Sequence, residues 1–147
     1  MEEARGDAGL TVAEPGRETN SDVIRRWVDA FNRRDIDSLI AQLDPDVELH
    51  EWPTAPGSQS YRGPDQIQAA VDSWFEVWDW MQIEIEDIVE AGDRMLVTLH
   101  QRAKGRGSEV EVEITSFNFY VFRDGKVKAM HLFTEPEPAR KLFDRAA

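Results

Sequence analysis

Residues 109–134 read EVEVEITSFNFYVF, then RDG, then KVKAMHLFT. Two runs rich in β-branched and aromatic residues flank an Asp-Gly pair, which is a strong local signal for a β-hairpin. The period of two in residues 110–114 gives the first run one apolar and one charged face. Further along both faces are apolar, except that Ser116, Asn118 and Tyr120 share one of them. This polar trio predicts a sheet whose concave side lines a pocket.

The composition restricts the class of protein. The chain has 147 residues, 41% of them hydrophobic, which suits one domain with a substantial core. Its formal net charge of −12 would repel nucleic acid and anionic membranes, so neither is expected as a partner. It has no cysteine, and no apolar run approaches the roughly 18–20 residues of a membrane span. The N-terminal sequence does not resemble a secretory signal peptide, so we expect a soluble, cytoplasmic protein.

Hydrophobic periodicity predicts the other elements. Residues 1–20 are expected to form a disordered tail without a role in the site, and residues 21–147 a single domain. Apolar residues at helical spacing predict helices over about residues 22–32, 36–43 and 64–78, with a short fourth helix from Pro136. Alternation predicts strands over 47–52, 81–86 and 95–101 besides the two hairpin arms, and residues 54–63 are expected to form a loop.

Short turns between consecutive strands require antiparallel pairing, and three helices should cover one face of the sheet. The predicted fold class is therefore α+β. We expect a cone-shaped half-barrel, in which a curved antiparallel sheet wraps around three helices with a pocket between them.

Five segments follow one another in a characteristic order and spacing: WVDAFNRRD (27–35), DPDVELHE (44–51), YRG (61–63), AGDR (91–94) and RDGKV (123–127). Together they resemble the nuclear transport factor 2-like superfamily. Within it, residues 21–146 are most similar to the SnoaL-like and ketosteroid isomerase-like bacterial proteins. The resemblance implies the half-barrel fold but no single reaction, because this fold hosts enzymes, binding modules and assembly domains.

Ketosteroid isomerases use tuned carboxyl groups, and the resemblance implies roles for particular residues. Their general-base aspartate lies at a position that resembles Glu51. Their tyrosine donor aligns with Trp27, and their protonated aspartic acid aligns with Asn118. A carboxylate is retained at the base position, whereas an indole N–H and an amide N–H, both weaker acids, replace the two donors.

Glu51 and Asn118 are the central candidates for catalysis. On an alternating strand Glu51 shares the inward face of Leu49, where it could remove a proton next to a carbonyl; the alternative is a strand-end glutamate facing water. Asn118 lies in an apolar run and needs hydrogen-bond partners. It either donates to a substrate oxygen, as in an oxyanion hole, or is satisfied by the backbone or by Ser116.

His100 and Arg102 are candidates on the strand over residues 95–101. In the register that the resemblance implies, His100 faces the cavity with Leu96 and Thr98 and could transfer a proton. A hydrogen-bonded core histidine is the alternative. Arg102, nearer the rim, could bind a substrate anion or keep Glu51 ionised, or it could be a solvated rim residue.

An apolar wall completes the predicted pocket, made of Trp27, Trp74, Tyr120 and Met130. Each could be plain core packing, but together, around a few polar groups, they fit a planar apolar ligand. His50 and His131 have the opposite parity and are expected to face outward. No metal-ligand spacing and no glycine-rich phosphate loop is present, so we expect neither a metal nor a cofactor.

The side of the sheet away from the helices is also predicted to be apolar, through Val97, Leu99, Phe117, Phe119, Val121 and Phe133. So large a contiguous apolar surface is unusual on a soluble monomer. We therefore expect a homodimer formed sheet against sheet, as the resemblance also implies.

The sequence favours a small-molecule enzyme with acid/base chemistry on a hydrophobic carbonyl-containing substrate, isomerase-like or polyketide cyclase-like. Glu51 would remove the proton, Asn118 with Trp27 would stabilise the enolate oxygen, and His100 would shuttle or orient. One alternative is a non-catalytic protein of the same fold that binds a hydrophobic ligand. Another is a protein-assembly module whose pocket is filled by aromatic side chains.

Overall fold

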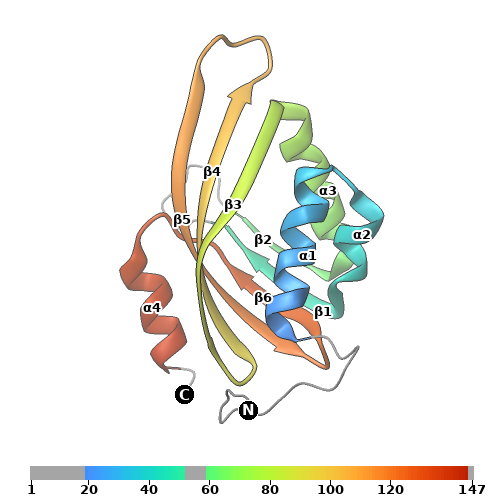
Figure 1. Ribbon diagram of the computed structural model, residues 1–147. Helices are drawn as coiled ribbons and strands as arrows, with labels where there is room; N and C mark the ends of the chain where they lie inside the picture. Colours follow the sequence, from blue (N-terminus) through green and yellow to red (C-terminus); the bar gives the residue numbers. More distant parts are fainter. Residues whose placement is uncertain (1–18, 52–58, 146–147) are drawn as a thin grey trace, which may run out of the picture.

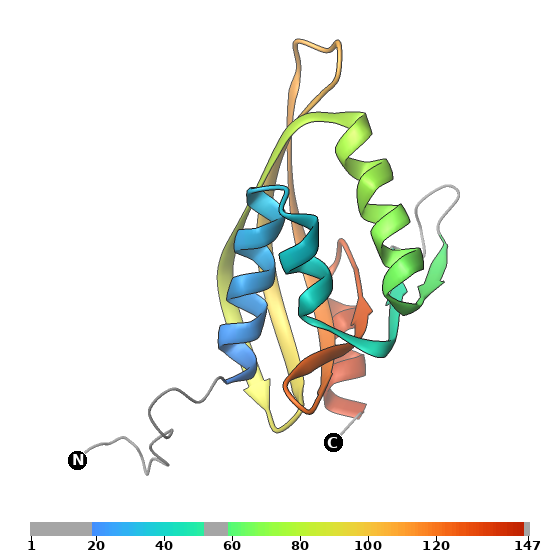
Figure 2. The same ribbon diagram turned by 90° about the vertical axis from the view of Figure 1, so that its right-hand side faces the viewer.

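The computed structural model describes residues 19–51 and 59–145, so the predicted tail lies outside the described residues except for Thr19 and Asn20. The elements in chain order are α1 (Asn20–Asn32), α2 (Ile36–Ala41), β1 (Leu43–His50), β2 (Ser60–Arg62), α3 (Gly63–Val77), β3 (Trp78–Ala91), β4 (Arg94–Gly105), β5 (Glu111–Arg123), β6 (Lys126–His131) and α4 (Pro136–Arg145) (Figure 1). The first three helices lie on the concave side of a curved sheet and α4 lies on the other side (Figure 2). The predicted α+β half-barrel is confirmed.

The six strands are ordered β2-β1-β6-β5-β4-β3. All neighbours are antiparallel except β1 and β6, which are parallel, so the prediction of a wholly antiparallel sheet is wrong at this pair. The rule for short turns does not apply to β1, because most of the chain separates it from β6. Strand β2 was expected to be loop, and its three residues are too few to show an alternation.

The β5–β6 hairpin forms where the Asp-Gly signal predicts it. Asp124 and Gly125 have φ values of +52° and +78°, and positive φ at both central residues defines a type I′ turn. Arg123, beside the turn, holds the hairpin to the start of β1: its Nε lies 2.9 Å from Asp44 Oδ2 and its Nη2 lies 2.6 Å from Oδ1. This hydrogen-bonded pair holds the pKa of the buried Asp44 carboxyl below its usual range.

Helix α1 begins with a capping box, in which Thr19 and Asp22 each accept a hydrogen bond from the backbone N–H of the other. At its other end the Asn32 carboxamide pairs with the free edge of β3. Its Nδ2 donates to the Ile83 carbonyl at 2.9 Å, and its Oδ1 accepts from the Ile83 N–H at 2.8 Å. One side chain thus substitutes for a missing strand partner and fixes α1 against the sheet.

Helix α2 ends at Ala41, two residues before the predicted end, and Leu43 opens β1 instead. The apolar spacing of this segment continues through the helix–strand junction, because both elements bury residues in the same core. Pro45 therefore lies within β1 rather than ending the helix. Among the described helices, none is long and apolar enough to cross a membrane.

The two faces of the sheet carry separate cores. The main core lies between the concave inner face and α1–α3. A smaller one, on the convex outer face, packs Leu96 and Phe119 against Ala139 and Phe143 of α4. The arrangement is therefore a three-layer one, with the sheet in the middle.

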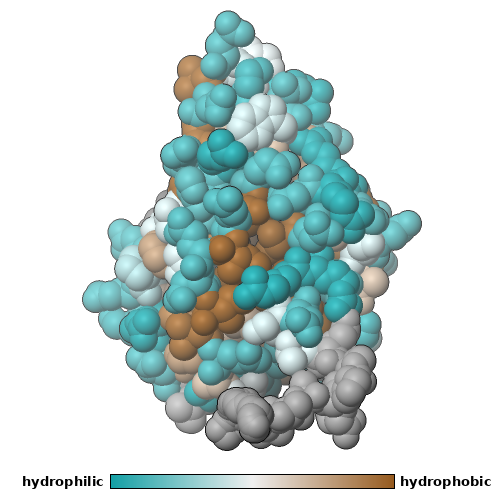
Figure 3. Space-filling model, in the orientation of Figure 1, coloured by the Kyte–Doolittle hydropathy of each residue, from teal (hydrophilic) through white to brown (hydrophobic). Residues whose placement is uncertain are grey.

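The predicted outer apolar surface is wrong for two of its members. Val97 and Leu99 are buried on the inner face, and Phe119 is covered by α4 of the same chain. Apolar surface is still visible over β3 and β4 between α4 and α1 (Figure 3), although within residues 19–51 and 59–145 the large hydrophobic side chains that are exposed are Val77, Val110 and Val112. Dimerisation stays a prediction, and sedimentation equilibrium at micromolar concentration tests it.

Candidate functional site

A cavity of about 500 Å³ lies between the inner face of the sheet and helices α1 and α3. This volume is within the usual range of about 300–1,000 Å³ for small-molecule sites. Most of its described wall is apolar, and the aromatic side chains in that part are Trp27, Phe31, Trp74, Trp78 and Tyr120. Its polar and charged residues are Glu51, Gln101, Glu113 and Asn118. The predicted pocket residues Trp27, Trp74, Tyr120 and Met130 are all in its wall.

Glu51 lines the cavity directly after the last residue of β1, on the same face as the buried Leu49. The segment before β2 holds it in place: the Gln59 N–H donates to Glu51 Oε1 at 3.1 Å, and the Glu51 N–H donates to the Gln59 carbonyl at 3.1 Å. Burial and, secondly, the Glu51 charge raise the pKa of Tyr61. Glu51 is half-buried and lies at the border of the cavity.

Asn118 and Tyr120 form a buried hydrogen-bonded pair in the cavity wall. Asn118 Nδ2 donates to the Tyr120 hydroxyl at 3.0 Å, and Asn118 Oδ1 has no partner among the described residues. Ser116 does not satisfy the amide: its hydroxyl accepts from Gln101 Nε2 at 2.8 Å, and among the described residues it makes no hydrogen bond to Asn118. Burial raises the pKa of Tyr120 to about 12, so the phenol is protonated at neutral pH.

This pair keeps a spare donor in either orientation of the amide. When Nδ2 donates to the phenol, the Tyr120 O–H hydrogen has no acceptor among the described residues. When the amide is turned, the phenol donates to Oδ1 and both Nδ2 hydrogens are left over. Asn118 and Tyr120 both line the cavity, so this spare donor belongs to its wall.

Trp27 offers a second donor. Its ring is 7% exposed and stacks on Phe31, with ring centroids 5.5 Å apart and an interplanar angle of 24°. Its Nε1 is buried, and no acceptor for it lies in the described part of the chain. A buried N–H without an acceptor costs about 1–3 kcal/mol, which a ligand acceptor would recover.

His100 and Arg102 lie on the outer face, contrary to the prediction. Their neighbours Leu99, Gln101 and Ala103 line the cavity, and side chains alternate along a strand. Nε2 of His100 lies 3.6 Å from Glu113 Oε2. The assumed register was wrong by one residue, because α4 buries part of the outer face of β4 and makes both of its faces partly apolar.

The cavity-lining residues that the sequence reasoning missed include Phe31, Trp78 and Gln101. Gln101 shares the parity of Leu99, so a correct register would have identified it. Phe31 was recognised as a core residue of α1, but its place in the wall depends on how α1 crosses the sheet. Trp78 is the first residue of β3 and ends the apolar stripe of α3, which gave no signal for a cavity.

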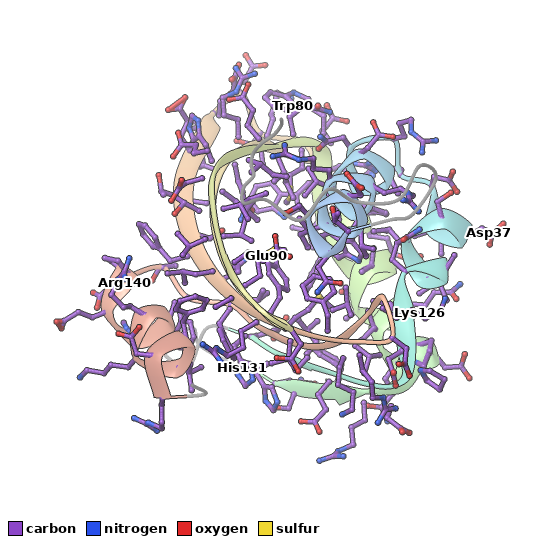
Figure 4. All side chains as sticks on the ribbon, turned by 60° about the horizontal axis from the view of Figure 1, so that its bottom comes forward. Asp37, Trp80, Glu90, Lys126, His131 and Arg140 are labelled. Atoms are coloured by element: carbon purple, nitrogen blue, oxygen red, sulfur yellow. The ribbon has the colours of Figure 1, made fainter. Side chains whose placement is uncertain are left out.

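His50 and His131 lie on the outer face, as predicted, and their rings stack with centroids 4.5 Å apart. Figure 4 shows His131 on the side of the sheet that carries α4. His50 Nδ1 is 2.9 Å from Ser60 Oγ, and His50 Nε2 is 3.1 Å from Glu48 Oε1. The hydrogen bond from His50 holds the pKa of Glu48 below its usual range. Burial and, secondly, the neighbouring His50 lower the pKa of His131. Both ring nitrogens of His50 have partners, so this network needs no ligand.

Several solved structures share the fold. A protein from Jannaschia sp. CCS1, provisionally assigned as a SnoaL-like polyketide cyclase, is 18% identical with a TM-score of 0.71, over 90% of this chain and 96% of that one. A protein from Catenulispora acidiphila DSM 44928 with a ketosteroid isomerase-like fold, solved with trimethylamine, is 12% identical with a TM-score of 0.70, over 78% and 86%. TerC, co-crystallised with polyporic acid, is 19% identical with a TM-score of 0.69, over 85% and 98%.

At these identities the likeness concerns the fold, which is that of the nuclear transport factor 2-like and ketosteroid isomerase-like proteins. Comparison with proteins of curated function finds no significant match. The family model of the SnoaL-like domain matches residues 24–130, from the middle of α1 to the end of the hairpin. The chain therefore belongs to the SnoaL-like domain family.

Proposed function

We propose that this protein is a small-molecule enzyme that applies acid/base chemistry to a hydrophobic, carbonyl-containing substrate, in the manner of an isomerase or a polyketide cyclase. One observation carries the proposal: the Glu51 carboxylate lines the same, otherwise apolar cavity as Trp27, whose indole N–H has no acceptor among the described residues, and as the hydrogen-bonded pair Asn118–Tyr120. The neighbours solved with trimethylamine and with polyporic acid support a small-molecule ligand.

Glu51 acts as the general base in this proposal. Its carboxylate takes a proton from the carbon next to the carbonyl, the C–H electron pair becomes the carbon–carbon double bond of an enolate, and the negative charge moves to the carbonyl oxygen. The apolar walls keep water from competing for the proton. Glu51 then returns the proton to a second carbon in an isomerisation, or the enolate attacks another carbonyl in a ring closure.

Trp27 and the Asn118–Tyr120 pair stabilise the enolate oxygen. Both donors are buried and already oriented, so little reorganisation is needed when charge develops. The Tyr120 phenol, whose pKa is raised to about 12, stays protonated and donates. His100 and Arg102 take no part in this scheme, because they lie across the sheet from the cavity.

A non-catalytic binding protein is the second candidate. The observation that favours it is that Glu51 and Glu113 are the only ionisable acids or bases, apart from Tyr120, in the described wall. A protein-assembly module with a filled pocket has less support. Trp74 and Tyr120 lie in the cavity wall and leave it open, and Phe75 packs on Phe31 with ring centroids 5.1 Å apart.

Deuterium exchange into 2-tetralone, a planar neutral ketone with acidic α-hydrogens, tests the proposal without knowledge of the natural substrate. In D₂O, NMR should show exchange at the α-carbon catalysed by the wild type. Glu51→Gln should slow it about 10²-fold or more, the usual contribution of a general base. The matched outer-face control His100→Gln should exchange at the wild-type rate.

Exchange by Glu51→Gln at the wild-type rate would contradict the assignment of the base. Saturable binding of 2-tetralone with no catalysed exchange by the wild type would favour the binding protein.

A further inference from the structure

The described part of the cavity wall contains no positively charged side chain with which to hold an anion. In the described part of its wall the charged residues are Glu51 and Glu113, with no Lys, Arg or His. The Glu113 carboxylate lies 3.6 Å from His100 on the outer face and its side chain is 62% exposed. Glu51 is therefore the charge that the cavity itself presents. Residues 52–58, which follow it, read WPTAPGS and include no ionisable side chain.

Cations near the α3–β3 end of the cavity are held by other groups. Arg34 donates to the carbonyls of Phe75, Trp78 and Asp79 and lies over the Phe75 ring. Lys104 Nζ is 3.6 Å from Asp79 Oδ2, and Arg106 Nε donates to the Glu76 carbonyl at 2.9 Å. None of the three lines the cavity.

We propose that the cavity selects its ligand by charge: it accepts planar hydrophobic molecules that are neutral or positively charged and rejects their anionic counterparts. The inference deepens the proposed function, since it concerns the same site, but it requires binding and not turnover. A carbonyl substrate would accordingly enter as the neutral ketone, and negative charge would arise only during the reaction.

The physical basis is desolvation. An anion entering this cavity would lose its hydration, find no cation and meet the Glu51 carboxylate at short range. A cation would lose hydration too, but it would be attracted by Glu51 and by the faces of Trp27, Trp74 and Trp78. The net charge of −12 acts in the same direction over longer distances.

Three probes on one naphthalene scaffold test the proposal at pH 7: 2-acetonaphthone (neutral), 2-naphthylmethylamine (a cation) and 2-naphthoate (an anion). Isothermal titration of the full-length chain gives the three dissociation constants. The ketone and the amine should each bind at least tenfold more tightly than 2-naphthoate. In Glu51→Gln the amine should weaken and 2-naphthoate should tighten, while the ketone changes by less than about threefold. Glu84→Gln, an exposed carboxylate on β3, should keep the wild-type ranking.

A dissociation constant for 2-naphthoate less than tenfold above that of the ketone would overturn the proposal. So would a ranking that Glu51→Gln leaves unchanged, or no binding of any probe. If the ranking holds while deuterium exchange is absent, charge selection is supported and the catalytic proposal fails, so the two failures are distinguishable.

Discussion

The inner and outer faces of the sheet differ in how fully their polar side chains are hydrogen-bonded. On the outer face His50 uses both ring nitrogens, with Ser60 and Glu48 as partners. On the inner face Trp27 Nε1 and Asn118 Oδ1 are buried, with no partner among the described residues. Buried groups of this kind cost about 1–3 kcal/mol each, which a ligand that paired with them would recover. The His50 network of the outer face is therefore complete, whereas these two inner groups are unpaired among the described residues.

Strand β4 contributes side chains to both faces within a few residues. Leu99, Gln101 and Ala103 face the cavity, while His100 and Arg102 face outward. Substitutions of neighbouring residues on this strand therefore test the two faces of the sheet independently.

The largest effect is expected from removing a buried leucine on each face of β4. Leu99→Ala should lower the free energy of unfolding by about 2–5 kcal/mol, because Leu99 is 2% exposed and belongs to the main core. Leu96→Ala should cost less, since Leu96 packs only in the small cluster under α4. Urea denaturation measures both, and equal losses would show that the outer core is as important as the inner one.

A smaller loss of stability is expected from substituting two buried polar side chains, one with a hydrogen-bond partner and one without. Asn118→Leu should lower the free energy of unfolding by about 1–3 kcal/mol, because the buried Tyr120 hydroxyl loses its partner. Trp27→Phe should cost less, because deleting an N–H without an acceptor offsets part of the lost ring packing. Both variants should bind 2-acetonaphthone more weakly. A larger stability loss in Trp27→Phe than in Asn118→Leu would indicate that the indole N–H is already satisfied.

The smallest effect is expected in the pH dependence of stability, which depends on His131 on the outer face. The pKa of His131 is lowered in the folded protein, so the unfolded chain binds this proton more readily. Stability should therefore fall as pH drops below the ordinary histidine pKa of about 6.5. Asp44 and Glu48, whose pKa values are also lowered, lose their contribution only below about pH 4.5 and leave this window clear.

Thermal unfolding between pH 7.5 and 5.5 checks this prediction with His131→Phe, which keeps an aromatic ring between His50 and Phe119. The decrease in stability should be smaller in the variant than in the wild type. An equal decrease would assign the pH dependence to another group.

The features that the sequence predicts correctly are those set by local chemistry. The Asp-Gly turn fixes the hairpin, and apolar spacing fixes the helices. Glu51 is correctly placed because Leu49, two residues earlier on one strand, indicates the inward face. Asn118 and Tyr120 share a face for the same reason.

The features that the sequence does not predict depend on contacts between distant segments. The parallel pairing of β1 with β6 is one of them. The register of β4 is another: because α4 covers the outer face, neither parity of the strand is purely polar. The place of Gln101 in the wall follows from that register, and the place of Phe31 follows from the crossing of α1 over the sheet.

A methyl-labelled NMR titration with 2-acetonaphthone tests the central claim, that the inner face is the ligand site, most directly. The claim predicts shifts for methyl groups of the cavity wall, such as Leu99, Ile114 and Met130. It predicts no shift for Leu96 of β4 or for Ala139 and Leu142 of α4. Shifts confined to the α4 side, or none at a saturating ligand concentration, would contradict it.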